Sequence, residues 1–495
     1  METLLAAAKT MEETGTNRYP LCSTLYHLPF SAEDILLKSK HFSSHSFLLE
    51  SADHHYENGR YSIIGFDPDL EISALKNKLR IKNPLENEVI IKDCRNPNIE
   101  IRKILKEYKT CLLPDMDFFT GGLVGYFSYD SLRYQEPKLQ LSEKGLPDFK
   151  DIDLMLFNSI IVMDHKKGCI HLISGVLKKD LKNSYCKAAK KIQKMEHMLM
   201  NAVNKKLAPL KLMSKLQERD DKESYLKKVE KAKEYIRQGD IFQVVYSNSI
   251  YADVKGSLFE CYRNLKKDNP SPYMFYFSSD DIEIAGSSPE TLVKVIQDKV
   301  YTYPLAGSRP RGKTQEEDDF LEKELLQDEK ELSEHNMLVD LGRNDIGRIA
   351  QIGSVKVEEY LNVHKYSAIM HIGSKVSGIL KEDKDALDAL QSILPAGTLS
   401  GAPKFRACEI IDELEQEKRG LYGGCVGYID FNGSMDMCIA IRLVYKKNGR
   451  AVIQSGGGIV YDSAGEREYM ERKNKAKAVV KALLKSVGEN YDLAY

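Results

Sequence analysis

The sequence predicts an α+β fold, in which large and mainly antiparallel sheets are flanked by helices. Strand-like segments occur in hairpin-like groups, such as residues 426–431, 437–445 and 451–455, which Asn-Gly turns connect. Helical segments are interspersed among these groups, a pattern that disfavours a doubly wound parallel sheet. A chain of 495 residues allows roughly two to four domains and a large core.

The first region, residues 19–175, reads as mixed strands and helices with Gly and Pro punctuation. Residues 151–163 and 169–174 are predicted to be strands on either side of a turn at Lys166-Lys167-Gly168. The preceding ~15 residues are expected to be mobile, as chain ends commonly are.

A helical linker is predicted over residues 176–223, where lysines are frequent. Apolar residues recur at helical spacing at Ala188, Ile192, Met195 and Leu199. This spacing favours an amphipathic helix with a solvated lysine face over a basic surface that binds a partner or nucleic acid.

The third region, residues 224–487, mixes predicted helices and strands. Helices are expected at 225–238, 318–341, 385–394, 403–415 and 466–485, and Gly239 is expected to end the first of them. Strands are expected at 242–251, 273–278, 282–285, 291–296 and 299–304, in addition to the three already named.

Composition limits the class of protein. Lys and Arg number 72 against 73 Asp and Glu, so no overall positive field favours nucleic acid. No apolar run approaches the ~20 residues of a membrane helix, so no membrane association is expected. Nine cysteines are scattered without a C-x-x-C pair, which favours a reducing, cytoplasmic location.

Two short segments offer groups for acid catalysis or ligand contact. Residues 304–312 (PLAGSRPRG) place a glycine and a serine where backbone can approach a ligand, although a solvated turn is the alternative. Ser287-Ser288-Pro289-Glu290 places a carboxylate after a proline turn, as a helix cap or as a partly buried acid.

Three further segments suit a cation and an anionic small molecule. Glu331, Glu334 and His335 share one helical face, which could equally be a solvated face. Residues 395–404 form a Gly/Thr/Ser loop that leads into a helix and can present N–H groups to an anion. Gly456, Gly457 and Gly458 permit close backbone approach, and the last helix follows with Glu468 and Glu471.

The set of segments resembles the chorismate-utilising enzymes over about residues 221–484. Leu48-Leu49-Glu50-Ser51 and Asn269-Pro270-Ser271-Pro272-Tyr273-Met274 are similar to the paired feedback motifs of anthranilate synthase large subunits. The resemblance implies two interleaved parts in which large sheets enclose a cleft. Residues 19–175 would then be regulatory, and residues 224–487 would be the chorismate-binding catalytic domain.

Two positions distinguish reactions within the resembling family. Ala306 stands where one group of aminodeoxychorismate synthases has a nucleophilic lysine, and alanine has no amine to form a covalent intermediate. Gln243 stands where isochorismate and salicylate synthases have a lysine that activates water, and a neutral amide cannot be that base. Ammonia remains as the nucleophile, which implies conversion of chorismate to anthranilate and pyruvate through aminodeoxyisochorismate.

The resemblance also implies roles for individual residues. Glu290 would be the general acid, His371 would assist pyruvate elimination, Thr398 would hydrogen-bond the substrate, and Gln243 would occupy the base position. Glu334 and Glu471 would bind Mg²⁺. The substrate binders would be Gly307, Ser308, Tyr422, Arg442, Gly456, Gly457 and Gly458. The chain departs from the usual pattern at Ser308, Ser400 and Arg472, where threonine is more common.

The resemblance further implies partners and regulation. A separate glutamine amidotransferase subunit would supply ammonia, and tryptophan would inhibit by binding at Ser51, Pro272, Tyr273 and Met274. Two alternatives stay open: an aminodeoxychorismate synthase that lacks the lysine, and a non-catalytic tryptophan-binding regulatory protein.

Overall fold

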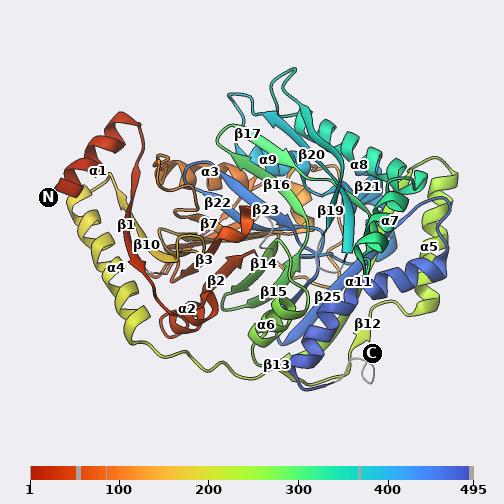
Figure 1. Ribbon diagram of the computed structural model, residues 1–495, viewed down its shortest axis with the longest axis horizontal. Coiled ribbons are helices and arrows are strands. Elements are labelled where there is room, and N and C mark those ends of the chain that lie inside the picture. The colour runs from red at the N-terminus through yellow and green to blue at the C-terminus, as the bar shows by residue number, and fades with distance from the viewer. Residues whose placement is uncertain (1, 52–56, 85, 366–368, 490–495) are drawn as a thin grey trace.

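Two large antiparallel sheets dominate the structure, a computed structural model that describes residues 2–51, 57–84, 86–365 and 369–489 (Figure 1). Helices cover the outer faces of both sheets. This arrangement confirms the predicted α+β class. In the described residues, no helix is both long and apolar enough to cross a membrane.

The first sheet has 13 strands and includes both the first strand of the chain, β1, and the last, β25. Its order is β1 (Arg18–Tyr26), β10 (Cys169–Leu177), β9 (Ser159–Asp164), β3 (Tyr61–Phe66), β2 (Ser46–Glu50), β14 (Tyr273–Ser278), β15 (Ile282–Ser288), β24 (Leu443–Lys447), β25 (Arg450–Ile459), β13 (Gln243–Lys255) and β11 (Lys211–Leu212), with β12 (Gln217–Glu218) and β21 (Gly401–Ala402) also paired to β13.

The second sheet has 12 strands. Its order is β18 (Leu305–Pro310), β20 (Ile369–Ile379), β17 (Lys299–Thr302), β16 (Thr291–Ile296), β23 (Met435–Ile439), β22 (Cys425–Asp430), β7 (Gly122–Phe127), β8 (Ile152–Phe157), β4 (Leu70–Leu75), β5 (Lys78–Asn83) and β6 (Glu88–Asp93), with β19 (Lys356–Lys365) also paired to β20.

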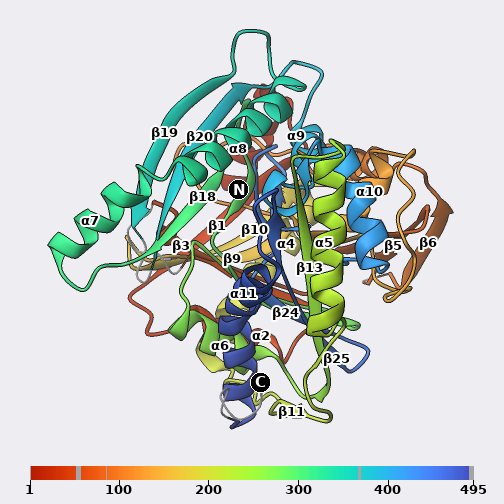
Figure 2. The same ribbon diagram turned by 90° about the vertical axis from the view of Figure 1, so that its right-hand side faces the viewer.

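Eleven α-helices and three 3₁₀ turns complete the described part of the chain. They are α1 (Glu2–Glu13), α2 (Ala32–Ser39), η1 (Glu57–Arg60), α3 (Pro97–Glu107), η2 (Tyr129–Tyr134), α4 (Leu181–Asn201), α5 (Lys222–Arg237), α6 (Phe259–Asp268), α7 (Gln315–Leu325), α8 (Glu329–Gly347), α9 (Ala386–Ile393), η3 (Gly397–Leu399), α10 (Lys404–Glu415) and α11 (Gly465–Ser486). In Figure 2, α7 projects from one side of the molecule.

Both sheets are built from both halves of the chain. In the first sheet, β2 pairs with β14, so that Leu49 lies opposite Phe275. In the second sheet, β7 pairs with β22, so that Val124 lies opposite Tyr428. The two halves are therefore interleaved, as the resemblance implied, because each supplies strands that complete the sheets of the other.

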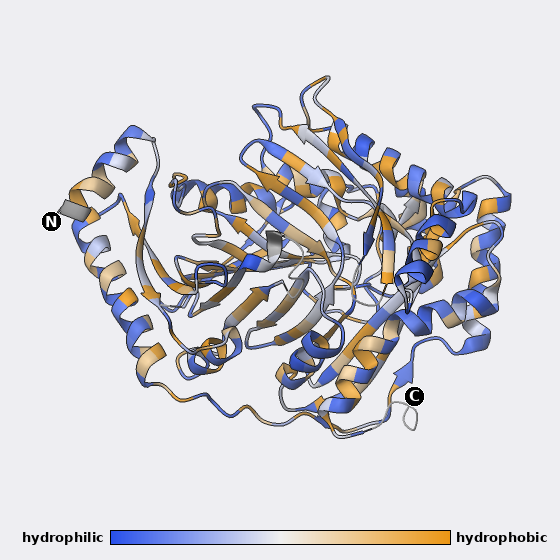
Figure 3. Cartoon of the chain, in the orientation of Figure 1, coloured by the Kyte–Doolittle hydropathy of each residue, from blue (hydrophilic) through white to orange (hydrophobic). Residues whose placement is uncertain are grey.

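Apolar residues recur along the strands and helices of both sheets (Figure 3), and in the described chain they form five buried clusters, of which three are large. The central layer joins the two sheets and includes Phe47 and Phe275 of the first sheet with Val124 and Val426 of the second. A second layer packs α4, α6 and α11 on the outer face of the first sheet. A third packs α3, α8 and α9 on the outer face of the second sheet.

Three local predictions are corrected by the structure. The predicted helix 318–341 is two helices, because Asp328 leaves the helical region and caps α8 through the N–H groups of Lys330 and Glu331. The predicted strand 437–445 is broken into β23 and β24, where Arg442 has a φ of +52°. The first residues form α1, whose Ala7 and Met11 are buried.

A buried ion pair between Arg419 and Glu415 connects several elements. The Arg419 guanidinium donates to Glu415 at 2.6 and 2.9 Å, to the Leu399 carbonyl at 2.6 Å and to the Val245 carbonyl at 2.7 Å. Glu415 also accepts from the N–H and hydroxyl of Ser247. The pair therefore ties α10 to β13 and η3 in the protein interior.

Removing one charge of this pair should destabilise the fold strongly. Arg419→Met leaves the Glu415 carboxylate buried without its cation, a change that costs about 3–5 kcal/mol. The double variant Arg419→Met/Glu415→Leu should be less destabilised, because no unpaired charge remains. Urea unfolding would compare both with Lys227→Met, which removes an exposed pair with Glu223. A single variant no less stable than the double one would contradict this account.

Candidate active site

Glu290 lies in the short link between β15 and β16 and faces the interior. The backbone is fixed there, because the Ile439 N–H donates to the Glu290 carbonyl at 2.9 Å and Ser288 Oγ donates to the Ile439 carbonyl at 2.7 Å. Thr398 of η3 donates its hydroxyl to Glu290 Oε1 at 3.0 Å. Both residues border a cavity of about 40 Å³, so the sequence-predicted acid and its neighbour are brought together.

The environment of Glu290 favours the protonated carboxylic acid. Burial raises its pKa to about 7, although the hydrogen bond from Thr398 and the charge of Lys475 both lower the pKa. A carboxyl group of this kind is partly protonated at neutral pH and can donate a proton to a leaving group.

His371 on β20 lies beside the part of strand β18 that contains Gly307 and Ser308. Gly307, with a φ of +65°, forms a bulge in β18, so that Ser308 lies opposite His371. The His371 Nδ1 atom is 2.9 Å from Ser308 Oγ and 3.1 Å from the Gly307 carbonyl. Because a carbonyl can only accept, this contact assigns the proton to Nδ1. Burial lowers the pKa of His371 to about 4, so the ring is neutral at pH 7 and Nε2 is unprotonated.

The three consecutive glycines of β25 lie against other predicted site residues. A Cβ on Gly456 would meet the Tyr246 carbonyl at 2.7 Å and the Tyr422 hydroxyl at 2.9 Å. A Cβ on Gly458 would meet Gln243 Nε2 at 2.4 Å. The absence of a Cβ at Gly456 and Gly458 therefore lets the Tyr422 hydroxyl and the Gln243 amide lie close to the strand.

Helices α8 and α11 each carry two carboxylates of the predicted site segments, Glu331 and Glu334 on α8 and Glu468 and Glu471 on α11. Gln243 Nε2 donates to Glu334 Oε1 at 3.3 Å, and Glu471 pairs with Lys475 at 2.8 Å. Burial and the charge of Glu334 raise the pKa of Glu331; burial and the charge of Glu471 likewise raise that of Glu468. An oxygen-rich, mutually repelling set of this kind fits a hard cation such as Mg²⁺.

Two basic groups face the same region. Arg442 is half-buried, and its charge acts on His371 and Tyr422. The charge of Lys475 lowers the pKa of both His371 and Glu290, so Lys475 lies close to both residues. Lys475 was missed by the sequence prediction; its position one turn after Glu471 on α11 was the available signal.

Arg472, a departure from the usual pattern, points away from the carboxylates. Its guanidinium donates to Glu218 at 2.7 Å and lies over the rings of Tyr225 and Tyr469. The side chain is fully buried, so it anchors α11 to the sheet edge.

A second and larger cavity, of about 1120 Å³, lies between the two sheets. Ser51, Pro272, Tyr273 and Met274, predicted from two distant motifs, all line it. Tyr273 donates to Asp436 at 2.8 Å and contacts Thr291 Oγ1 at 2.7 Å. The volume exceeds the roughly 300–1,000 Å³ that is common for small-molecule sites.

Comparisons with known proteins show the family to which the chain is similar. Residues 44–481 match the family model of chorismate binding enzymes. The chain is 45% identical to anthranilate synthase component 1 of Acetivibrio thermocellus, with 90% of this chain and 92% of that protein aligned. It is 42% identical to the protein of the same name from Pseudomonas aeruginosa, with 95% and 96% aligned.

A solved structure gives the same result. Anthranilate synthase component I from Streptococcus pneumoniae superimposes with a TM-score of 0.73 at 39% identity, with 85% of this chain and 92% of that chain covered. The chain therefore belongs to the chorismate binding enzyme family, in the branch of the anthranilate synthase component 1 proteins, and is a chorismate-utilising enzyme.

Replacing the buried acid should reveal its cost to stability. The Glu290 pKa is about 7 in the folded protein and about 4.5 when exposed, so its stabilising contribution is lost as pH rises toward 7. Between pH 5 and pH 8, Glu290→Gln should therefore gain about 2–3 kcal/mol of unfolding free energy relative to the parent chain. Urea unfolding at both values measures this. Glu223→Gln, at an exposed position, should show no comparable gain, and a pH-independent Glu290→Gln difference would refute the assignment.

Proposed function

We propose that the chain converts chorismate and ammonia to anthranilate and pyruvate through aminodeoxyisochorismate. The observation that carries the proposal is the pair Ala306 and Gln243, which supply neither a nucleophilic amine nor a basic lysine beside the acid Glu290. The names of the aligned relatives support the same reaction.

The residues present can perform both stages of this reaction. Protonated Glu290 donates to the departing C4 hydroxyl of chorismate while ammonia attacks C2, and Thr398 holds the carboxyl in place. In the second stage, the unprotonated Nε2 of His371 accepts a proton as pyruvate is eliminated. Arg442 and the backbone of Gly456, Gly457 and Gly458 are the proposed contacts of the substrate carboxylates, since a guanidinium can pair with a carboxylate through two hydrogen bonds.

We also propose that Glu334 and Glu471 hold Mg²⁺, with Glu331 and Glu468 beside them. A bound Mg²⁺ would neutralise the ring carboxylate of chorismate and so orient it. The support is the chemistry of the carboxylate set and its mutual repulsion.

Product analysis tests the reaction. With chorismate, Mg²⁺ and an ammonium salt at alkaline pH, the chain alone should form anthranilate and pyruvate, because free NH₃ replaces the delivered nucleophile. Glutamine should support turnover only after addition of a glutamine amidotransferase subunit, the partner we propose. Accumulation of 4-amino-4-deoxychorismate or isochorismate would reject the reaction, and glutamine-dependent turnover by the chain alone would reject the partner.

Substitution of the carboxylates tests the metal site. Glu334→Gln and Glu471→Gln should each lose most ammonia-dependent activity at limiting Mg²⁺ while the far-ultraviolet circular dichroism stays unchanged. Glu329→Gln, on the exposed face at the start of α8, should keep its activity. If either site variant retains near-parental turnover at limiting Mg²⁺, that residue is not a ligand.

Tryptophan is the proposed inhibitor, and the large cavity is its proposed site. Ser51 follows β2 of the first half of the chain, whereas Pro272, Tyr273 and Met274 belong to the second half. A ligand that contacts both halves can favour one arrangement of the sheets and thereby affect the distant acid. Apolar surface from Met274 and Ile63 suits an indole ring.

Filling the cavity should remove this regulation. Ser51→Phe should relieve inhibition by tryptophan at least tenfold in concentration and leave ammonia-dependent turnover largely intact. Because the chain contains no tryptophan, indole-selective fluorescence reports bound ligand directly. A saturating concentration of tryptophan that neither binds nor inhibits the parent chain would overturn the regulatory proposal.

A further inference from the structure

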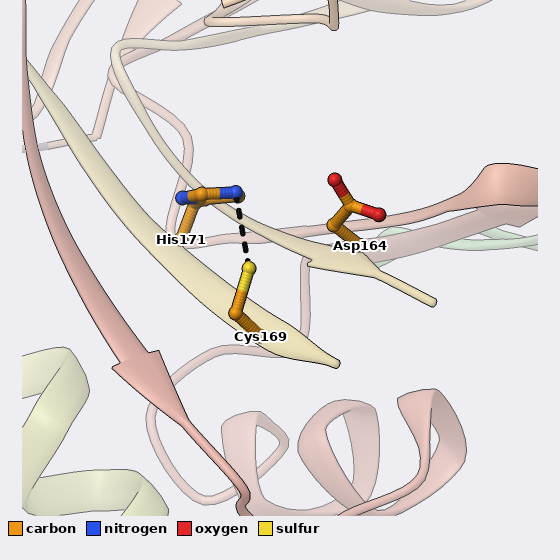
Figure 4. A group of neighbouring side chains, drawn as sticks. All are labelled: Asp164, Cys169 and His171. Atoms are coloured by element: carbon orange, nitrogen blue, oxygen red, sulfur yellow. Dashed lines mark hydrogen bonds between the residues drawn. The ribbon is translucent and has the colours of Figure 1, made fainter. Parts of the chain in front are cut away.

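A cluster of three possible metal ligands lies on the hairpin of β9 and β10 (Figure 4). In Figure 1, β10 lies on the opposite side of the molecule from α8 and α11. Asp164 ends β9 and lies directly opposite Cys169, the first residue of β10. His171 is two residues further along β10, so its side chain lies on the same face as that of Cys169. In the part of the chain that the structure describes, only these three residues place ligand atoms of three such side chains within 4.8 Å of one another.

The spacing of these atoms is that of a tetrahedral zinc site. Cys169 Sγ and His171 Nε2 are 3.5 Å apart. Two ligands at Zn–S of about 2.3 Å and Zn–N of about 2.0–2.1 Å, separated by a tetrahedral angle, also lie about 3.5 Å apart. A metal can therefore replace the thiol–imidazole hydrogen bond without a large movement of either strand.

Hydrogen bonds and ring contacts from neighbouring residues already orient Asp164 and His171, as the residues around a metal site orient its ligands. His171 Nδ1 contacts the Thr24 hydroxyl at 2.9 Å, which directs Nε2 toward the cluster. Asp164 Oδ1 accepts from the N–H groups of Lys166 and Lys167, both at 3.0 Å, and Oδ2 accepts from Arg60 at 2.8 Å. Phe118 stacks on the His171 ring with a centroid separation of 4.9 Å.

The electrostatic state of the ligands also suits a metal. All three side chains are buried, so a cation bound between them would be shielded from solvent. Arg60, which pairs with Asp164 at 2.8 Å, and Lys167 bring positive charge that opposes a cation. The thiolate and the carboxylate of the loaded site carry two negative charges, which would offset the charge of a divalent cation.

We propose that Asp164, Cys169 and His171 form a second metal site, selective for Zn²⁺ or a similar borderline-soft cation over Mg²⁺. Binding forms one metal–sulfur, one metal–nitrogen and one metal–oxygen bond and releases the Cys169 thiol proton to solvent. Water completes the fourth position. The thiolate and imidazole distinguish this site from the all-carboxylate set on α8 and α11.

Cobalt titration tests the proposal, because Co²⁺ replaces zinc and reports thiolate ligation by colour. The metal-free full-length chain, titrated with Co²⁺ in excess Mg²⁺, should gain one equivalent of a sulfur-to-cobalt charge-transfer band. Zn²⁺ should abolish the band by displacement. Cys169→Ser should lose the band, whereas Cys22→Ser should keep it, since the Cys22 sulfur lies 3.8 Å from the opposite nitrogen of His171.

Two results would overturn the site: no thiolate band in the parent chain, or an equal band in Cys169→Ser. X-ray absorption of the zinc-loaded parent chain gives a second measurement that needs no variant. One sulfur ligand together with nitrogen and oxygen ligands supports the site, and a zinc shell without sulfur rejects it. Glu334→Gln/Glu471→Gln should leave the cobalt band unchanged, which separates this site from the proposed Mg²⁺ site.

Discussion

The buried Arg419–Glu415 pair is the interaction on which the geometry of the active site depends. Arg419 holds the carbonyl of Leu399, one residue after the Thr398 that hydrogen-bonds Glu290, and the carbonyl of Val245, two residues after Gln243. Its guanidinium also lies over the rings of Tyr129 and Tyr422. A charge buried here requires its counter-ion, so the ion pair fixes η3, β13 and the Tyr422 ring together.

Strand β23 lines both cavities, because the two sheets are interleaved. Met435, Asp436 and Cys438 of β23 line the large cavity, whereas the next residue, Ile439, borders the small cavity and donates its N–H to the Glu290 carbonyl. Tyr273 adds a second connection through Thr291, the neighbour of Glu290. A ligand in the large cavity would therefore contact elements that hold the acid, which is the contiguous route that coupling between the sites would use.

Burial also sets the chemical character of each group in the site. Desolvation raises the pKa of Glu290 to about 7 and lowers that of His371 to about 4, so at pH 7 the carboxyl group is partly protonated and the imidazole is neutral. The carboxylates on α8 and α11 differ, because a neighbouring carboxylate on the same helix adds to burial in raising the pKa of Glu331 and of Glu468.

Local sequence determined much of the secondary structure. Gly239 ends α5 with a φ of +81°, and Asn448-Gly449 turns β24 into β25 with both residues at positive φ. Such features depend on a few neighbouring residues and so can be predicted from them. The residue types at Glu290, Ala306, Gln243 and His371 likewise limited the reaction before any contact was known.

Only the tertiary structure decided how these residues work. The pKa of Glu290 depends on burial beneath η3, which is 108 residues away in the chain at Thr398. The contribution of Lys475 and the direction of Arg472, which pairs with Glu218, likewise depend on long-range packing. Hydrophobic periodicity indicates which face of a helix or strand is buried, but it does not indicate which distant element covers that face. The local sequence pattern therefore determined the helices, the strands and the types of side chain. The packing between the two halves decided which of these side chains lie close together and which are protonated.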